Sequence, residues 1–378
     1  MLQYKKKYAL QGFHTDSISC LSVSPDINRF ASGGLDGRLF VWSLESGSLL
    51  YNLESHKAIY CSVWSQRDPN CILVGCQDGL LMTVVIQETE IQTSRFRAHT
   101  AHIECLSLAQ NGVDLATGAH NEVTLWHKKL SPSSERVMWK QGSKIPLPPH
   151  LDGLEDTKDV IAVSIHWHEQ PRHIRDNVCD GTLLVSYLWH GTICWDLTSL
   201  TMVWRIPALN CLSAALSPDH CWLAMFRLPH EFQIYNIKSD FRAQKMQAPL
   251  ETGVQQLPVV FGHDGLALIG GSATGRVRVW DTTSGDRLQV LVHDDCHVQA
   301  LACFYDEMQD NFVIITGTSQ GEDSQVCLWE TGPRKKKDHA LTRLARNFHI
   351  FLTLPELVGL AVMVNVVIAC SVLYKYLL

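Results

Sequence analysis

Residues 31–42 read Ala-Ser-Gly-Gly-Leu-Asp-Gly-Arg-Leu-Phe-Val-Trp. The pair Asp36-Gly37 between two apolar runs predicts two antiparallel strands joined by a tight turn, the second strand covering residues 38–42. Upstream, the apolar run 18–23 and the turn residues 24–26 predict an inner strand. Downstream, residues 48–53 fit a fourth strand. The stretch is therefore the centre of a unit of four short antiparallel strands.

Six further stretches repeat this pattern with a Trp, or a residue in place of it, at the same point. They place the equivalents of Trp42 at Val84, Trp126, Trp195, Tyr235, Trp280 and Trp329. Most intervals between these positions are 40 to 49 residues, a period typical of propeller blades. The sequence therefore predicts an all-β fold, a seven-bladed β-propeller over residues 1–331.

One interval, from Trp126 to Trp195, is much longer than the others. It contains the Pro-, Ser- and charge-rich residues 130–157, which we interpret as an insertion loop between blades.

The repeats resemble those of the WD-repeat family, in which a His, a Ser or Thr, an Asp and a Trp form a hydrogen-bonded tetrad inside a blade. The resemblance implies tetrad roles, partial in the later units, for His14, Ser32, Asp36, Trp42, His56, Asp78, His99, Thr117, Asn121, Trp126, Ser186, His190, Trp195, Trp280, Asp323 and Trp329. It also implies ring closure by the first strand, about residues 6–13, because the last unit stops after its third strand at Trp329. The resemblance indicates little about function, because propellers serve many different functions.

Composition and motifs argue against an enzyme, a cofactor or a nucleic-acid partner. The net charge is only −6, and no nucleophile elbow, P-loop or zinc-protease motif occurs. The thirteen cysteines form no C-x-x-C pair and several lie in apolar runs, so we expect buried thiols in a reducing compartment. His166 and His168 alternate on one strand with His173 nearby, but no third ligand is suitably spaced. We expect no metal site.

Trp189 directly precedes the turn position of the fourth unit, which in the WD-repeat family tends to lie on the partner-binding face. Tryptophan is enriched in binding hot spots, so Trp189 is a candidate partner-binding residue. The alternative is a Trp packed against the next blade or under the insertion.

The C-terminus differs in character from the repeats. Residues 357–374 carry no charge over eighteen positions, the lower limit for a membrane span. We predict a basic juxtamembrane linker at 332–354 and a single transmembrane helix at 355–376. No signal peptide precedes the repeats, so the protein is expected to be tail-anchored. The basic residues before the span favour a cytosolic propeller, and Asn365 could support a homodimer through the helix.

Two functions fit this layout. The first is a membrane-anchored protein–protein interaction scaffold that presents its propeller to the cytosol and binds other proteins through the propeller faces. The second is a membrane-bound guanine-nucleotide exchange factor of a small GTPase in vesicle budding from the endoplasmic reticulum. The known exchange factor of this pathway resembles the present layout, with a cytosolic propeller followed by a single C-terminal span. The short apolar span favours the endoplasmic reticulum, with the mitochondrial outer membrane as the alternative.

Overall fold

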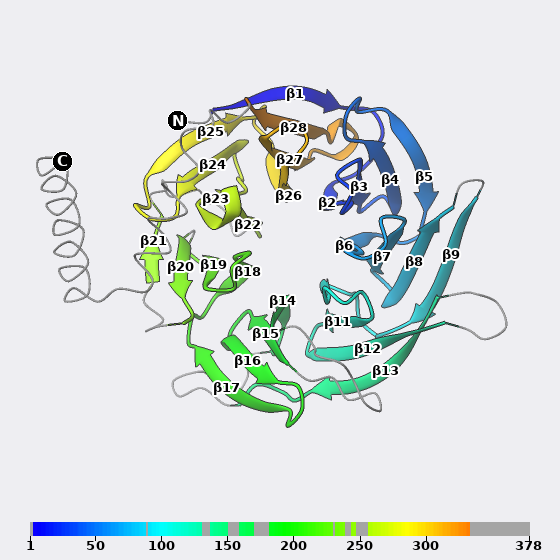
Figure 1. Cartoon of the computed structure of the whole chain (residues 1–378), viewed down its shortest axis with the longest axis vertical. Coiled ribbons are helices and arrows are strands. Elements are labelled where there is room, and N and C mark those ends of the chain that lie inside the picture. Colours follow the sequence, from blue (N-terminus) through cyan, green and yellow to red (C-terminus); the bar gives the residue numbers. More distant parts are fainter. Residues whose placement is uncertain are drawn as a thin grey trace, which may run out of the picture. The chain divides into compact units, whose positions relative to one another are not determined.

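The computed structural model describes residues 3–87, 90–130, 137–149, 159–169, 181–229, 231–238, 243–246 and 256–332. These residues belong to one compact unit, Met1–Gly332. It is an all-β ring of seven antiparallel four-stranded sheets (Figure 1), so the predicted seven-bladed propeller is confirmed.

The first three blades follow the chain order. Blade 1 contains β2 (Ile18–Val23), β3 (Arg29–Gly34), β4 (Arg38–Ser43) and β5 (Leu49–Glu54). Blade 2 contains β6 (Ile59–Trp64), β7 (Cys71–Cys76), β8 (Leu80–Ile86) and β9 (Ile91–Arg97). Blade 3 contains β10 (Cys105–Leu108), β11 (Asp114–Ala119), β12 (Glu122–Leu130) and β13 (Val137–Ile145).

The next three blades repeat this order. Blade 4 contains β14 (Ala162–Glu169), β15 (Thr182–Tyr187), β16 (Gly191–Asp196) and β17 (Thr201–Ile206). Blade 5 contains β18 (Cys211–Leu216), β19 (Trp222–Arg227), β20 (Glu231–Asn236) and the short β21 (Ala243–Lys245). Blade 6 contains β22 (Val259–Gly262), the 3-10 helix η1 (His263–Gly265), β23 (Ala267–Gly270), β24 (Arg276–Asp281) and β25 (Arg287–Val292).

Blade 7 closes the ring with the two ends of the repeat region. It contains β26 (His297–Asp306), β27 (Asn311–Ser319), the 3-10 helix η2 (Gly321–Asp323) and β28 (Val326–Thr331), and its outer strand is β1 (Tyr4–Leu10). The predicted closure by the first strand is therefore confirmed. Lys6 lies over the Trp329 ring at 4.9 Å, and Tyr4 Oη lies 2.6 Å from His263 Nε2 in blade 6.

The interpretation of residues 130–157 as an insertion loop is wrong in its central part. Residues Val137–Ile145 form β13, the outer strand of blade 3, which pairs with β12 over nearly its full length. Their polar composition misled the prediction because an outer strand is exposed along most of its length, and all but one of the side chains of β13 are exposed or half-buried. Residues 131–136 and 150–158 lie outside the described part of the chain.

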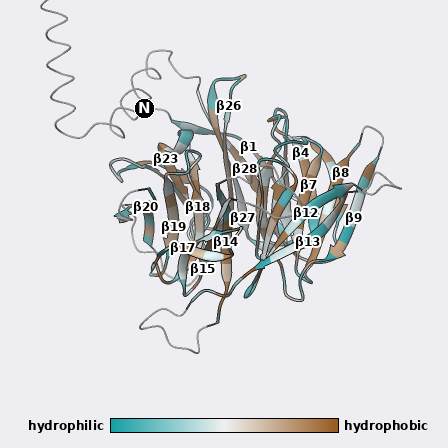
Figure 2. Ribbon diagram, turned by 60° about the horizontal axis from the view of Figure 1, so that its bottom comes forward, coloured by the Kyte–Doolittle hydropathy of each residue, from teal (hydrophilic) through white to brown (hydrophobic). Residues whose placement is uncertain are grey.

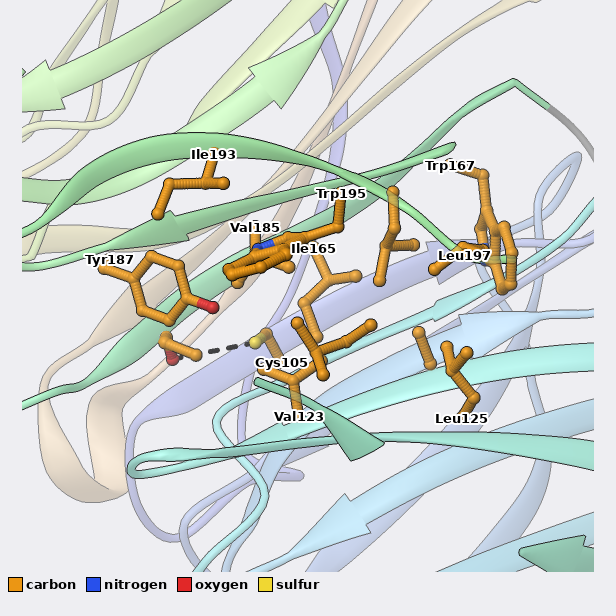
Figure 3. Close-up of a cluster of buried hydrophobic side chains, with 14 of the residues drawn as sticks. Cys105, Val123, Leu125, Ile165, Trp167, Val185, Tyr187, Ile193, Trp195 and Leu197 are labelled. Carbon is orange, nitrogen blue, oxygen red and sulfur yellow. Dashed lines mark hydrogen bonds between the residues drawn. The ribbon is translucent and has the colours of Figure 1, made fainter. Parts of the chain in front are cut away.

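The hydrophobic core is divided into clusters that lie largely between neighbouring blades. Outer strands such as β9 and β13 carry many hydrophilic residues, whereas the middle strands are buried (Figure 2). Figure 3 shows the cluster that joins blade 3 to blade 4, where Cys105 and Leu125 meet Trp167 and Trp195. Because each blade buries apolar surface against its neighbours, the ring is stabilised as a whole.

No helix within the described ranges is long and apolar enough to cross a membrane. The predicted transmembrane helix 355–376 and the linker beyond Gly332 lie outside those ranges.

Candidate functional site

In blade 1 the four residues assigned to a tetrad meet in one buried network. His14 Nδ1 lies 3.1 Å from Asp36 Oδ2, and His14 Nε2 lies 2.9 Å from Ser32 Oγ. Trp42 Nε1 donates to the same Ser32 Oγ at 2.9 Å. Burial raises the pKa of Asp36, but hydrogen bonds from His14, Arg38 and Thr15 outweigh it and leave the pKa below its usual value. The network ties the start of the blade to its third strand.

Blade 3 builds the same network with one substitution. Thr117 Oγ1 lies 2.7 Å from His99 Nε2 and accepts from Trp126 Nε1 at 2.8 Å. The carboxylate facing His99 Nδ1 belongs to Glu122, at 3.2 Å, and not to the neighbouring amide Asn121 that the sequence favoured. Asn121 is an exposed residue immediately before β12, whereas Glu122 begins the strand.

Blade 7 contains part of such a network, in which the Trp bonds to a hydroxyl residue that the sequence did not reveal and the His packs without a hydrogen bond to any described residue. Trp329 Nε1 donates to Thr316 Oγ1 at 3.2 Å, and the buried His293 ring lies against Trp329 with its centroid 5.3 Å away. The predicted Asp323 is instead an exposed residue of η2. In blades 1 and 3 the histidine and the hydroxyl residue are 18 positions apart. The long β26 and β27 widen that spacing in blade 7 and hide the match.

Blade 4 departs from the expected arrangement by one residue of register. Trp195 pairs across the strands with Leu183, so the hydroxyl position is held by Val185 rather than Ser186. Successive side chains of a strand point to opposite faces, so Ser186 points away from the Trp195 side and its Oγ lies 2.8 Å from Thr192 Oγ1. His190 is buried in the following turn.

Blades 2 and 6 also lack the expected network. His56 is an exposed residue with a left-handed backbone (φ 63°), and Asp78 accepts the amide of Leu80 within a turn. Trp280 is fully buried, but the position that holds Ser32 in blade 1 is Gly270 in blade 6. A Cβ at Gly270 would lie 2.6 Å from the Phe232 ring, so the site has no room for a hydroxyl side chain.

The inner-strand cysteines pack between blades. Cys61 Sγ donates to the Ile103 carbonyl at 3.3 Å, and Cys105 Sγ donates to the Ala162 carbonyl at 3.7 Å (Figure 3). Burial raises the pKa of the Cys211 and Cys303 thiols to about 12. Burial also holds the pKa of the Cys61 thiol well above its ordinary value. A buried, protonated thiol is a poor nucleophile, so these side chains serve packing.

The histidines of β14 point toward blade 5. His166 Nε2 donates to the Ala214 carbonyl at 3.0 Å, and burial lowers the pKa of His166. The carbonyl of His168 accepts from His220 Nδ1 at 2.5 Å. Within the described ranges, no three His, Cys, Asp or Glu side chains are grouped so that they could hold a metal ion, and His173 lies outside those ranges.

One concave surface lies at the end of the ring where the inner strands begin. It is a recess of about 470 Å³ that receives residues from all seven blades, with Leu35, Leu188 and Leu212 among its apolar lining. Its polar lining includes His102 and Glu104, whose Nε2 and Oε1 are 3.0 Å apart. Burial raises the pKa of Glu104 although His102 opposes this shift. Trp189, half-buried, follows Leu188 in the turn between β15 and β16.

Comparison with known proteins supports the repeat assignment and covers part of the chain. Residues 5–43 match the family model "WD domain, G-beta repeat". Small ribosomal subunit protein RACK1 of Schizosaccharomyces pombe is 29% identical over 123 residues, 30% of this chain and 38% of that protein. Human angio-associated migratory cell protein is 37% identical over 70 residues, 18% of this chain and 16% of that protein.

The chain therefore spans less than two fifths of the length of these relatives. The matched segment begins in β1 of blade 7 and ends with β4 of blade 1, so the sequence repeat is offset from the blade by one strand. The chain is a seven-bladed propeller in which residues 5–43 match the WD domain, G-beta repeat.

Proposed function

We propose that this chain is a membrane-anchored platform for protein–protein interaction, with its propeller in the cytosol. The observation that carries the proposal is the recess of about 470 Å³ to which every blade contributes. Concave surfaces with an apolar lining and a few convergent polar groups are the usual form of binding sites. The hydrogen-bonded networks of blades 1 and 3 and the buried thiols have structural roles, the first within a blade and the second between blades.

Trp189 is the residue of this face that we expect to anchor a partner. It is half-buried beside Leu188, which lines the recess, and tryptophan side chains dominate many interface hot spots. A half-buried position leaves part of the ring available to a partner while its neighbours hold the rotamer.

The experiment compares Trp189→Ala with Met138→Ala, the truncation of a 56% exposed apolar residue on the outer strand β13 that does not line the recess. Both full-length variants and the parent are used to recover partners from detergent extract by quantitative affinity capture. We expect Trp189→Ala to lose specific partners by about tenfold or more, as loss of a hot-spot residue does, with an unchanged melting temperature. A large drop in melting temperature would make Trp189 a core residue, and full partner recovery would remove it from the binding face.

The membrane part of the proposal rests on the eighteen uncharged residues 357–374 and on the basic residues that precede them. Carbonate extraction and protease protection on sealed microsomes test it. The chain should remain in the pellet while the propeller is digested from outside. Release into the supernatant, or a protected propeller, would contradict tail anchoring.

Two finer assignments accompany the anchor. A short apolar span favours the endoplasmic reticulum over the plasma membrane, with the mitochondrial outer membrane as the alternative, and fractionation decides between them. Asn365 within the span would support a homodimer by hydrogen bonding between two helices. Cross-linking tests this by comparing the yield of dimer from the Asn365→Leu variant with that from the parent. Nucleotide-release assays with a panel of small GTPases separate the platform from the exchange-factor alternative.

A further inference from the structure

A second concave surface lies at the seam where blade 7 meets blade 1. It is a groove of about 830 Å³ formed by the β2–β3 and β4–β5 turns of blade 1 and the β26–β27 turn of blade 7. These turns lie at the opposite end of the strands from the turns that line the recess, so the two surfaces are separate. The half-buried Pro25 and Ile27 give the groove its apolar surface, above the buried Leu44, Val313 and Leu328.

The lining of the groove is strongly acidic. Five carboxylates line it, those of Asp26, Glu45, Asp306, Glu307 and Glu330. Lys7 is the one basic residue among the lining residues, and its Nζ lies 3.1 Å from Glu330 Oε2. Asp306 accepts the backbone amides of Met308 and Gln309 in its own turn.

Three of the five carboxylates are exposed, and two of these lack a basic partner, because Asp26 lies 3.8 Å from Arg29. Glu45 and Glu307 are exposed, and no basic group of a described residue lies within 4.0 Å of either carboxylate. Uncompensated like charges at one groove create a local negative potential that favours a cationic ligand.

Two further side chains point to a ligand with both apolar and hydrogen-bond-donating groups. Met308 is 96% exposed at the tip of the β26–β27 turn, an unusual position for an apolar side chain and one suited to an adaptable contact surface. Asn311 is only 5% exposed, and its Oδ1 has no hydrogen-bond partner. Alternation along β27 places Asn311 on the same face as Val313, which lines the groove.

We propose that this seam groove binds a basic, amphipathic segment of a partner protein. Apolar side chains of the segment would lie on Pro25, Ile27 and Met308, and its Lys or Arg side chains would meet Glu45 and Glu307. Asn311 does not itself line the groove, and its buried Oδ1 is an acceptor that only a donor reaching below the groove surface would satisfy. The groove is distinct from the recess, so this site stands whether or not Trp189 binds a partner.

The test measures the fluorescence anisotropy of a labelled peptide of alternating leucine and lysine upon titration with the full-length protein. The double variant Glu45→Gln with Glu307→Gln removes the two exposed carboxylates. Its matched control, Glu54→Gln with Glu322→Gln, removes the same charge at exposed residues that do not line the groove. We expect the groove variant to bind about tenfold more weakly and the control to bind like the parent.

Three outcomes would overturn the proposal. They are the absence of saturable binding to the parent, equal binding by the groove variant and the control, and equal binding of a peptide of alternating leucine and glutamate. Equal melting temperatures of the three proteins exclude misfolding as the cause of lost binding. Trp189→Ala should leave the peptide affinity unchanged, which keeps failure of the groove distinguishable from failure of the recess.

Discussion

The hydrogen bond from Trp42 to Ser32 can be weighed against a natural control within the same ring. Trp42 and Trp195 occupy the same position in blades 1 and 4 and are 1% and 2% exposed. Trp42 Nε1 donates to Ser32 Oγ at 2.9 Å, whereas Val185 holds the corresponding position in blade 4, so Trp195 lacks this hydroxyl acceptor. The substitutions Trp42→Phe and Trp195→Phe remove similar ring volume and differ in this bond.

We expect Trp42→Phe to lower the free energy of unfolding by about 1–3 kcal/mol more than Trp195→Phe does, the usual cost of breaking a buried hydrogen bond. Trp42→Ala would cost about 3–5 kcal/mol because the ring contacts with Phe13, Phe30 and Phe40 are also lost. Urea titrations of the full chain, with the slope checked for each variant, measure these differences.

A double-mutant cycle completes this test. If Ser32 and Trp42 act in one network, Ser32→Ala should cost less in the Trp42→Phe background than in the parent. Equal losses for the two Phe variants, together with an additive cycle, would refute the view that the blade 1 network stabilises the ring beyond ordinary packing.

Three other predictions concern the ring. Burial, reinforced by the charge of Lys6, lowers the pKa of His293 from 6.5 in the unfolded chain to about 4. The neutral His293 therefore stabilises the fold fully above pH 6.5, and this contribution falls by roughly 3 kcal/mol as the pH drops to 4. His293→Gln should make the free energy of unfolding depend less on pH between pH 7 and pH 5 than it does in the parent. Removing residues 1–10 leaves β28 without its outer partner, so the melting temperature should fall and a peptide of residues 1–12 should restore part of it; an unchanged melt would contradict closure by β1. Replacing residues 131–136 with a short Gly-Ser link should leave a folded ring, whereas deleting 137–145 should not, because the second deletion removes β13; equal melts would contradict the corrected strand assignment.

The ring was predictable because its signals are local. Turn residues, alternation and a Trp at a steady period are all written within about forty residues. The strand at Arg38–Ser43 and its neighbours lie within one or two residues of the expected bounds. The outer strand β13 was missed for the reverse reason, since an exposed outer strand needs few apolar residues and is easily taken for a loop.

The tetrads were less predictable because they depend on cross-strand register. The separation between the hydroxyl residue and the Trp is 10 positions in blade 1, 9 in blade 3 and 13 in blade 7. In blade 4 both Ser186 and Val185 fall within that range, and only the turn between β15 and β16 decides which of them faces Trp195. A shift of one residue reverses the face of a side chain, so spacing alone could not choose.

The recess and the seam groove, if both bind partners as proposed, are two separate faces of the ring. The recess is lined at the beginnings of the inner strands, and the seam groove is lined by turns at their far ends. A six-residue strand spans roughly 20 Å, so occupants of the two surfaces need not collide. Their chemistry also differs, because the recess is centred on the ring with apolar walls, whereas the groove carries an excess of carboxylates at one seam. In this proposal the ring would hold one partner at each end and so bring two proteins together, and the pairing of β1 with β28 closes the ring that separates the two faces.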